Sequence, residues 1–396
     1  MSALVLVACS GPTPASTVPE APVRSDPARP VDDARAAERH VWATSTRSPQ
    51  PFDARAGDGS PCGSSDRALE RVAERIALRE AAGKRPLDTS ELTFALRSEG
   101  APYVWPRAWT LEGPFGVEVE RAKLTEWLAT LGDHGERRCG SATLRTTEGR
   151  RALGAIAVSV LADLEPLPTR VTIGTWLDVR ATLLVPATSA EVVVLGPRGR
   201  PHAVLASLAG TRVRARFRAD REGAWLVQVL ATTADGPRVV TEALVAAGTE
   251  PPETYDFGHA PGEELAEGAR TPEEVVLAMV NAARRAEGLA PVRRDGALDR
   301  LAAAQAQAVL GHRTLSHVAS GEGLDERVSA LDLHSAGENV AHATNLARAH
   351  RSLWRSPSHR ENLLHPAFEL VGVGVARDDD GSVWLCQIFA ARNAPH

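Results

Sequence analysis

Two stretches, residues 10–61 and 251–270, most constrain what this 396-residue chain can fold into. The first is rich in Pro, Ala, Ser, Thr and Arg and has almost no apolar periodicity. Such a composition cannot bury enough surface to offset the entropy lost on ordering. The second is polar and acidic. The sequence therefore predicts a disordered tether and a linker, with two or three folded domains in the remainder.

Charge and hydropathy exclude two broad classes of protein. The formal net charge is −5, and no basic cluster interrupts the acidic balance. This argues against a nucleic-acid partner. The sequence has no apolar run long enough for a membrane-spanning helix, which needs about 18 residues or more. We therefore expect domains that fold in water.

The stretches 62–165 and 166–250 differ in their patterns. In the first, apolar residues recur at helical spacing over residues 66–82 and 118–131, and residues 156–161 are strand-like. This pattern predicts an α-rich domain of no family that we can name. In the second, about six short alternating runs are separated by Gly, Pro and Asp turn signals. This pattern predicts an Ig-like β-sandwich that serves as a spacer.

The cysteines favour an exported protein. Cys62 and Cys139 bracket one region and are each followed by Gly, so we expect a disulfide between them in an oxidising compartment. Cys386 lies in an alternating apolar run and is expected to be a buried free thiol. The chain has no CxxC pair, so no cysteine-based zinc site is predicted.

The first nine residues, MSALVLVAC, end in a Leu-Val-Ala-Cys sequence that resembles the lipobox of bacterial lipoproteins. The resemblance implies that residues 1–9 are a signal remnant and that Cys9 is acylated. The protein would then be anchored by lipid in the cell envelope. Ser10 follows the cysteine in place of an inner-membrane retention aspartate, which favours the outer membrane. The alternative is a leader without an anchor on an extracellular protein.

The C-terminal stretch, 271–396, has the pattern of helices on a small sheet. Thr271, Pro272 and Glu274 form a capping-box sequence at the start of the first helix. Further helices are expected from Asp295 and over residues 345–354. Valines alternating with glycines at 371–375, a turn at Asp380-Gly381 and a second alternating run predict a β-hairpin.

The same stretch resembles the CAP superfamily of cysteine-rich secretory, antigen 5 and pathogenesis-related proteins, and is closest to its bacterial SCP-like members. The resemblance covers about 120 residues and rests on motifs in matching order. The motifs are Val280-Asn281, Gly288-Leu289, Leu315-Ser316-His317, Gly337-Glu338-Asn339-Val340-Ala341, Trp354 to Leu364 and Val371 to Ala376. It implies an α-β-α sandwich with a cleft that holds two histidines and two acids.

Matched position by position, the family cleft would contain His317, Glu338 and His359. In some family members this cleft binds a divalent metal. The second acid of the animal proteins corresponds here to Pro357, so a full tetrad is not expected. Two imidazoles and one carboxylate with an open position would suit zinc. The polar atoms of such a site would lie within about 4–7 Å of one another.

Other roles for these residues remain open. Glu338 could act as a general base, with His317 or His359 as the acid. Each of the three could also be structural: His317 bonded to a loop, Glu338 to backbone N–H groups and His359 to the short helix that it starts. The sequence alone does not decide among a metal site, an acid–base site and a structural cluster.

The sequence therefore predicts a multidomain cell-envelope lipoprotein whose C-terminal domain binds a small ligand, a peptide or a glycan. An enzyme is the less favoured alternative, because Pro357 removes one acid–base candidate. That alternative is a metal-dependent hydrolase acting on peptide or cell-wall material. A structural surface protein with an idle cleft is the third.

Overall fold

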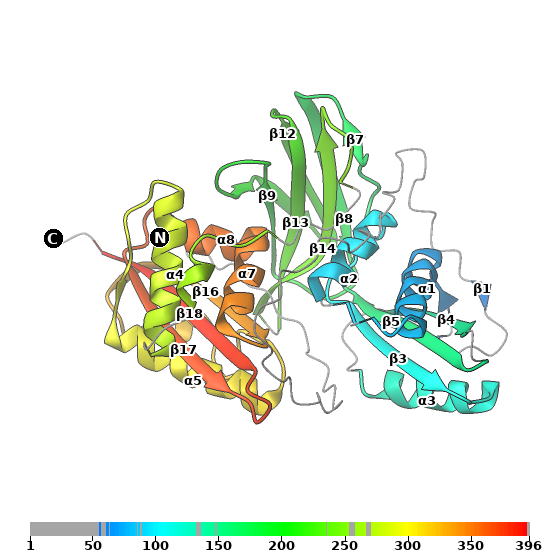
Figure 1. The fold of residues 1–396 in the computed structure, drawn as a ribbon. Helices are drawn as coiled ribbons and strands as arrows, with labels where there is room; N and C mark the ends of the chain where they lie inside the picture. The colour runs from blue at the N-terminus through cyan, green and yellow to red at the C-terminus, as the bar shows by residue number, and fades with distance from the viewer. Residues whose placement is uncertain are drawn as a thin grey trace.

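The computed structural model describes residues 55–56, 61–62, 64–84, 86–87, 89–131, 136–146, 149–234, 236–252, 258–266 and 271–393. Cys9 with its lipobox, most of the expected tether and part of the expected linker lie outside the described residues. The described part forms three units in chain order (Figure 1). Among the described residues, no helix is both long enough and apolar enough to cross a membrane.

The first unit packs helices on a five-stranded sheet of order β1-β2-β4-β5-β3. Its elements are β1 (Arg55–Ala56), β2 (Ser64–Ser65), α1 (Arg67–Ala81), α2 (Thr89–Ser98), β3 (Arg107–Gly113), α3 (Val117–Ala129), β4 (Glu136–Arg145) and β5 (Arg151–Val160). Helix α1 begins where the Asp66 carboxylate accepts hydrogen bonds from the N–H groups of Ala68 and Leu69. Its buried stripe then packs on the sheet.

The expected description of this unit as α-rich is incomplete, because two ten-residue strands form its centre. The strand-like residues 156–161 fall largely within β5, whose earlier part is buried without the alternation by which a strand is recognised in sequence. Glycines let α1 lie directly on these strands. A Cβ at Gly154 would lie 2.4 Å from the carbonyl oxygen of Ala73, and one at Gly140 would lie 2.4 Å from the carbonyl carbon of Leu69.

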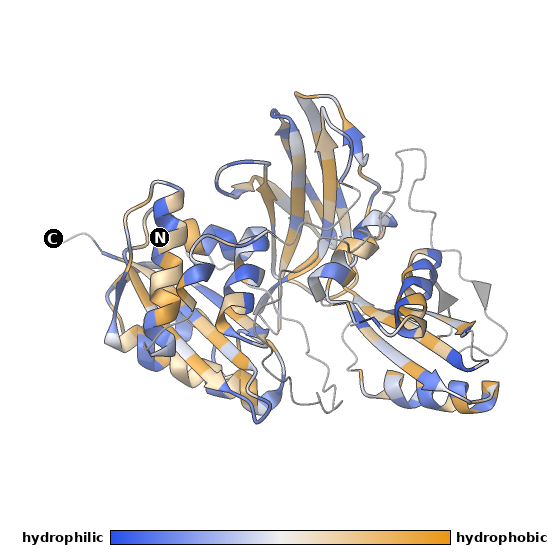
Figure 2. Cartoon of the chain, viewed as in Figure 1, coloured by the Kyte–Doolittle hydropathy of each residue, from blue (hydrophilic) through white to orange (hydrophobic). Residues whose placement is uncertain are grey.

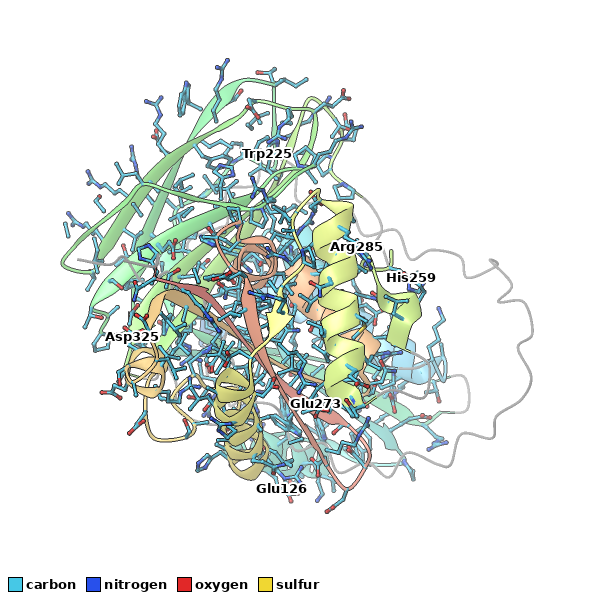
Figure 3. All side chains as sticks on the ribbon, turned by 90° about the vertical axis from the view of Figure 1, so that its left-hand side faces the viewer. Glu126, Trp225, His259, Glu273, Arg285 and Asp325 are labelled. Atoms are coloured by element: carbon cyan, nitrogen blue, oxygen red, sulfur yellow. A yellow bond between two sulfur atoms is a disulfide. The ribbon has the colours of Figure 1, made fainter. Side chains whose placement is uncertain are left out.

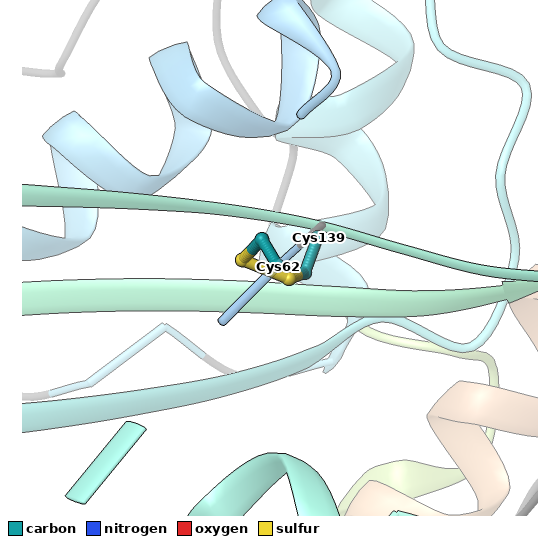
Figure 4. Close-up of a disulfide and its surroundings, with 2 residues drawn as sticks. All are labelled: Cys62 and Cys139. Atoms are coloured by element: carbon teal, nitrogen blue, oxygen red, sulfur yellow. A yellow bond between two sulfur atoms is a disulfide. The ribbon is translucent and has the colours of Figure 1, made fainter. Parts of the chain in front are cut away.

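A disulfide joins Cys62 to Cys139 of β4, in the middle of this sheet (Figure 4). It ties the segment before α1 to strand β4 and closes a loop with a sequence separation of 77 residues. Cys386, in the third unit, is a buried free thiol.

Removing the disulfide with Cys62→Ser and Cys139→Ser is expected to destabilise the first unit by about 2–4 kcal/mol. The chain-entropy model gives about 4–5 kcal/mol for a loop of this length, and residual structure in the unfolded chain lowers that value. Hydrogen exchange of the β4 and β5 amides measures the change. Non-reducing peptide mapping of the wild type should find the linked pair, whereas a bridge to Cys386 would contradict this pairing.

The second unit is a β-sandwich of two sheets, ordered β10-β9-β13-β14-β7 and β11-β12-β8-β6. Its strands are β6 (Ala162–Leu164), β7 (Arg170–Val171), β8 (Thr175–Leu183), β9 (Ser189–Leu195), β10 (His202–Val204), β11 (Ala206–Ala209), β12 (Arg212–Ala219), β13 (Gly223–Thr233) and β14 (Gly236–Ala247). Buried and exposed residues alternate strictly along β12, and the inward side chains form one core with Trp225. Both hydrophobic (orange) and hydrophilic (blue) residues occur along the strands of the sandwich (Figure 2). Because β6 belongs to the sandwich, this unit begins a few residues before the expected boundary at 166.

The third unit has a four-stranded sheet of order β15-β17-β18-β16 between two layers of helices. Its elements are α4 (Pro272–Ala286), β15 (Arg293–Arg294), α5 (Gly296–His312), α6 (Leu324–Val328), β16 (Leu333–Ala343), α7 (Leu346–Arg355), α8 (Pro357–Leu364), β17 (Leu370–Arg377) and β18 (Val383–Arg392), and a 3₁₀ helix, η1 (Glu263–Ala266), precedes them. Helices α4, α7 and α8 contribute to the core on one face, and α5 and α6 to the core on the other. The strand order places β16 at an edge of the sheet.

Local signals explain where the helices of this unit begin. The capping box at Thr271 is formed, with Thr271 and Glu274 each bonded to the other's backbone N–H. Asp295 caps α5, and Asn345 caps α7. The expected hairpin is β17 and β18, which pair antiparallel from Leu370 to Arg377.

Candidate functional site

A buried ionic cluster lies beside β16, the edge strand of the third unit. Nδ1 of His317 lies 2.6 Å from Oε1 of Glu338, and Nη2 of Arg327 lies 2.7 Å from Oε2 of the same carboxylate. Arg327 also donates to the carbonyl oxygen of His317 at 3.1 Å. The side chains of His317, Glu338 and Arg327 are 1%, 0% and 5% exposed. Both oxygens of Glu338 are therefore engaged inside the protein.

The surroundings of Glu338 keep it ionised. Burial alone would raise the pKa of this carboxyl group, but the hydrogen bond from His317 and the charge of Arg327 outweigh it and hold the pKa below its usual value. The thiol of Cys386 also donates to Oε2, with sulfur and oxygen 3.4 Å apart, and burial raises the pKa of that thiol. A carboxylate held in this way orients His317 and is a poor proton acceptor.

His359, in α8, approaches the same strand through its backbone. The side-chain amide of Asn339, next to Glu338 on β16, donates to the carbonyl oxygen of His359 at 3.1 Å. Asn362, one turn further along α8, donates to the carbonyl oxygen of Glu338 and to Oδ1 of Asn339. A Cβ at Gly337 would lie 2.4 Å from Oδ1 of Asn362. Gly337 therefore leaves space for Asn362, and hydrogen bonds of Glu338 and Asn339 hold α8 against β16.

The imidazole of His359 is buried and uncharged. Burial, and then the charge of His317, lower the pKa of His359 to about 3, so the ring is neutral at physiological pH. In the described part of the chain, Nε2 of His317 and Nε2 of His359 are both buried without a hydrogen-bond partner. Such atoms are costly unless a water or ligand satisfies them.

The structure therefore gives the three expected site residues unequal roles. His317 and Glu338 are in direct contact, and His359 is fixed to the strand that carries Glu338. Among the described residues, no three His, Cys, Asp or Glu side chains are gathered so that they could hold a metal ion. Glu338 does not fit the role of a zinc ligand, because His317 and Arg327 occupy its two oxygens. Only the two imidazoles remain as donors, fewer than the three or four that zinc takes from a protein.

Sequence reasoning missed two features of this site. Arg327 belongs to no motif that we identified, although it is an arginine beside the buried Leu324 and Val328 of α6. Strand β16 was also missed, because it buries Ser335, Glu338 and Asn339 and so lacks an apolar alternation. Helix α6 has the sequence LDERV, in which Arg327 is one of three charged residues, so no signal in the sequence singles it out.

The β-sandwich covers this site. Oε1 of Gln228 on β13 accepts a hydrogen bond from the N–H of Ser358 at 3.1 Å, and Arg360 donates to the carbonyl oxygen of Gly199 at 3.2 Å. At the β13–β14 turn, a Cβ at Gly236 would lie 3.3 Å from Cβ of His317. The sandwich is therefore more than the spacer that the sequence suggested, because it forms one wall of the histidine site.

Two cavities reach the histidines from different sides. One, of about 650 Å³, is lined by all three units and includes His359, Gln228, Trp105 and Trp354. The other, of about 720 Å³, lies between the sandwich and the third unit and includes His317. Both volumes are in the range of small-molecule sites, about 300–1,000 Å³.

Comparison with known proteins identifies the class of the third unit. Residues 277–389 match the family model described as CAP, the cysteine-rich secretory protein family. The C-terminal unit is therefore a CAP domain. The curated uncharacterized protein YkwD of Bacillus subtilis (strain 168) is 31% identical over 121 residues, which are 30% of this chain and 46% of YkwD. The chain thus spans about half the length of that relative.

Solved structures with some similarity include an outer surface protein from Borrelia burgdorferi. It is 20% identical with a TM-score of 0.29, over 30% of this chain and 92% of that one. An extracellular SCP-domain protein from Bacillus anthracis str. Ames is 15% identical with a TM-score of 0.27, over 58% of this chain and 88% of its own. A cysteine-rich secretory protein from Staphylococcus aureus is 12% identical with a TM-score of 0.27, over 59% and 84%. Scores this low support no inference about function.

Proposed function

We propose that this is a cell-envelope protein whose CAP domain binds a small peptide or glycan fragment beside His317 and His359. The observation that carries the proposal is the pair of buried Nε2 atoms without hydrogen-bond partners in the described residues. Each histidine lies in the wall of a cavity large enough for such a ligand. A polar group of the ligand would satisfy each imidazole and recover the cost of burying it.

Binding is favoured over turnover by the state of Glu338. A general base needs a pKa near the working pH and a free oxygen, and Glu338 has neither. The competing candidate is a hydrolase, which is favoured by the contact between His317 and Glu338. A carboxylate that orients a histidine through Nδ1 is also the arrangement of hydrolytic triads. Among the described residues, no hydroxyl or thiol is hydrogen-bonded to Nε2 of His317 as a nucleophile would be.

The envelope location is part of the proposal. The disulfide between Cys62 and Cys139 is consistent with folding in an oxidising compartment. A lipid on Cys9 would attach the chain to a membrane surface, with the outer membrane favoured. A tether over residues 10–61 would then hold the folded units away from that surface.

The test uses the full chain and a disaccharide-peptide released from peptidoglycan by a muramidase. Saturable binding by calorimetry is expected, and His317→Ala or His359→Ala should weaken it about tenfold or more because each removes a buried hydrogen bond. His312→Ala is the matched control, since that side chain is exposed at the end of α5 and should leave the affinity unchanged.

Chromatography of the same mixtures separates the three functions. The unchanged fragment is expected at all times with the wild type. New products that disappear with His317→Ala would show that the protein is a hydrolase. If the wild type does not bind the fragment, the remaining function is that of a structural surface protein whose cleft is idle.

A further inference from the structure

One face of the β-sandwich carries a row of arginines. The sheet β11-β12-β8-β6 turns one face into the sandwich core and the other to solvent. The exposed positions of β12 are Arg212, Arg214, Arg216 and Arg218. Alternate residues of a strand lie about 6.6–6.8 Å apart, so the row is about 20 Å long. Because an inward residue separates each arginine from the next, the row is not visible as a run of basic residues in the sequence.

This face points away from the CAP domain. Strand β13, which contacts the CAP domain through Gln228, belongs to the other sheet of the sandwich. Figure 3 shows side chains projecting outward from the strands of the sandwich, above the CAP domain and around the labelled Trp225. The arginine row is therefore open to a partner that does not block the histidine site.

Acidic side chains neutralise only part of the row. Among the acids of this face, Asp178 lies 3.4 Å from Arg216, and Asp163 lies 3.3 Å from Arg138 of the first unit. Within the described part of the chain, the first two arginines of the row, Arg212 and Arg214, take part in no ion pair. The face therefore has positive charge that the described residues do not balance.

Two arginines also meet across the strands. Arg214 of β12 is directly opposite Arg180 of β8 in the register of the sheet. Like charges in directly opposite positions destabilise a sheet. Glu165 lies 3.6 Å from Arg180, but both side chains are more than half exposed, so this pair offsets little of the repulsion. An anion bound at this place would relieve it.

Large apolar side chains are exposed on the same sheet, which is an independent observation. Four of the seven that are exposed in the described part of the chain lie on or beside it: Ile173, Trp176, Leu184 and Leu205. Trp176 is 54% exposed and lies directly opposite Arg218, with the guanidinium carbon of Arg216 5.0 Å from its ring centre. Leu205, which is 95% exposed, directly precedes β11. Exposed apolar groups gathered in this way indicate an interaction surface.

Arginine and apolar side chains on one face favour a lipid surface over a soluble polyanion. The phosphate groups of either partner would pair with the guanidinium groups. A bilayer also receives tryptophan and aliphatic side chains at its interface, whereas a soluble polyanion has no apolar phase to receive them. Charge attraction and buried apolar area then add in the binding of an interfacial protein.

We propose that the outward face of the sheet β11-β12-β8-β6 docks on an anionic lipid surface, with its arginines against the phosphate groups and Trp176 and Leu205 in the interface. The proposal goes beyond the proposed function and does not depend on the CAP cleft. Docking by this face leaves the CAP domain on the side of the sandwich away from the lipid.

The test measures flotation of the full chain with vesicles, and carries Cys9→Ser so that no lipid on the protein contributes. Saturable binding is expected to vesicles that contain phosphatidylglycerol, and none to vesicles of pure phosphatidylcholine. The double variant Arg212→Gln and Arg214→Gln should weaken binding about tenfold or more, because each basic side chain near an anionic surface contributes about fivefold. Its thermal unfolding should be unchanged or raised, since a like-charge pair is removed.

A matched control changes the net charge by the same amount elsewhere. Arg300→Gln with Arg348→Gln alters two exposed arginines on helices of the CAP domain and should leave vesicle binding unchanged. Trp176→Ala tests the apolar contact and should weaken vesicle binding several-fold. Dextran sulfate, a soluble polyanion, is the second probe, and Trp176→Ala should not change the binding of the protein to it.

Four results would overturn the inference. The first is an absence of binding to the anionic vesicles, and the second is equal binding to both kinds of vesicle. The third is equal weakening by the two double variants, which would show that net charge alone acts. The fourth is binding to dextran sulfate without binding to vesicles, which would make this face a site for soluble polyanions.

Discussion

Replacing Arg327 by methionine is expected to lower the free energy of unfolding of the CAP domain by about 3–5 kcal/mol. The guanidinium is the cationic partner of a carboxylate that is 0% exposed, and its loss leaves the charge of Glu338 buried and poorly compensated. Arg327 also donates to the carbonyl oxygen of His317, so the loop that carries this histidine should loosen as well. Native-state hydrogen exchange of the β16 and β18 amides measures the change and reports this domain separately from the other two.

Two further variants test whether the effect of Arg327→Met comes from the loss of a buried ion pair. Arg294→Met breaks a pair with Asp299 at 2.8 Å that is partly exposed, so it should cost far less. Adding Glu338→Gln to Arg327→Met should recover part of the loss, because the uncompensated charge is removed with its partner. Equal losses for Arg327→Met and Arg294→Met would contradict the buried cluster.

Gly374→Ala is expected to destabilise the same domain by about 1–3 kcal/mol or more, because the added methyl group has no space. A Cβ at this position would lie 2.2 Å from the carbonyl carbon and the carbonyl oxygen of Ala302 in α5. Gly372 is placed in the same way against Leu298, one turn earlier. Helix α5 therefore lies directly on β17, and a side chain at either glycine must push the helix away from the sheet.

Gly311→Ala provides the matched control. Gly311 lies in α5, the helix that packs on Gly374, and nothing lies within 4 Å of the added Cβ. The variant should be neutral or stabilising by up to about 1 kcal/mol, because alanine is the better helix former. Thermal unfolding of the two variants checks the contrast. Similar behaviour of Gly374→Ala and Gly311→Ala would show that α5 does not rest on β17.

Local signals made much of the CAP domain predictable from its sequence. Thr271, Asp295 and Asn345 each precede a helix whose N–H groups they cap, and such caps act over a few residues. The alternation in β17 and β18 identified the hairpin. Strand β16 could not be found in this way, because its buried polar residues are satisfied by distant partners such as Arg327 and Asn362.

The sequence alone could not predict that the β-sandwich covers the site. It depends on contacts such as Gln228 with Ser358, which are 130 residues apart in sequence. No periodicity or motif reports a pairing of this kind. The resemblance to the CAP superfamily located His317, Glu338 and His359, but only the geometry separated the role of Glu338 from those of the histidines. Contacts between the sandwich and the CAP domain therefore form part of the wall of the histidine site.

The most direct test of the account is ¹⁵N NMR of the histidine side chains in the full chain, recorded before and after addition of the peptidoglycan fragment. The account predicts that Nδ1 of His317 is protonated in the free protein, because it donates to Glu338. On addition of the fragment, the Nε2 resonances of His317 and His359 should both shift. The exposed His312 should not respond. Unmoved resonances at His317 and His359 under conditions that saturate the fragment would contradict a binding site in this cleft.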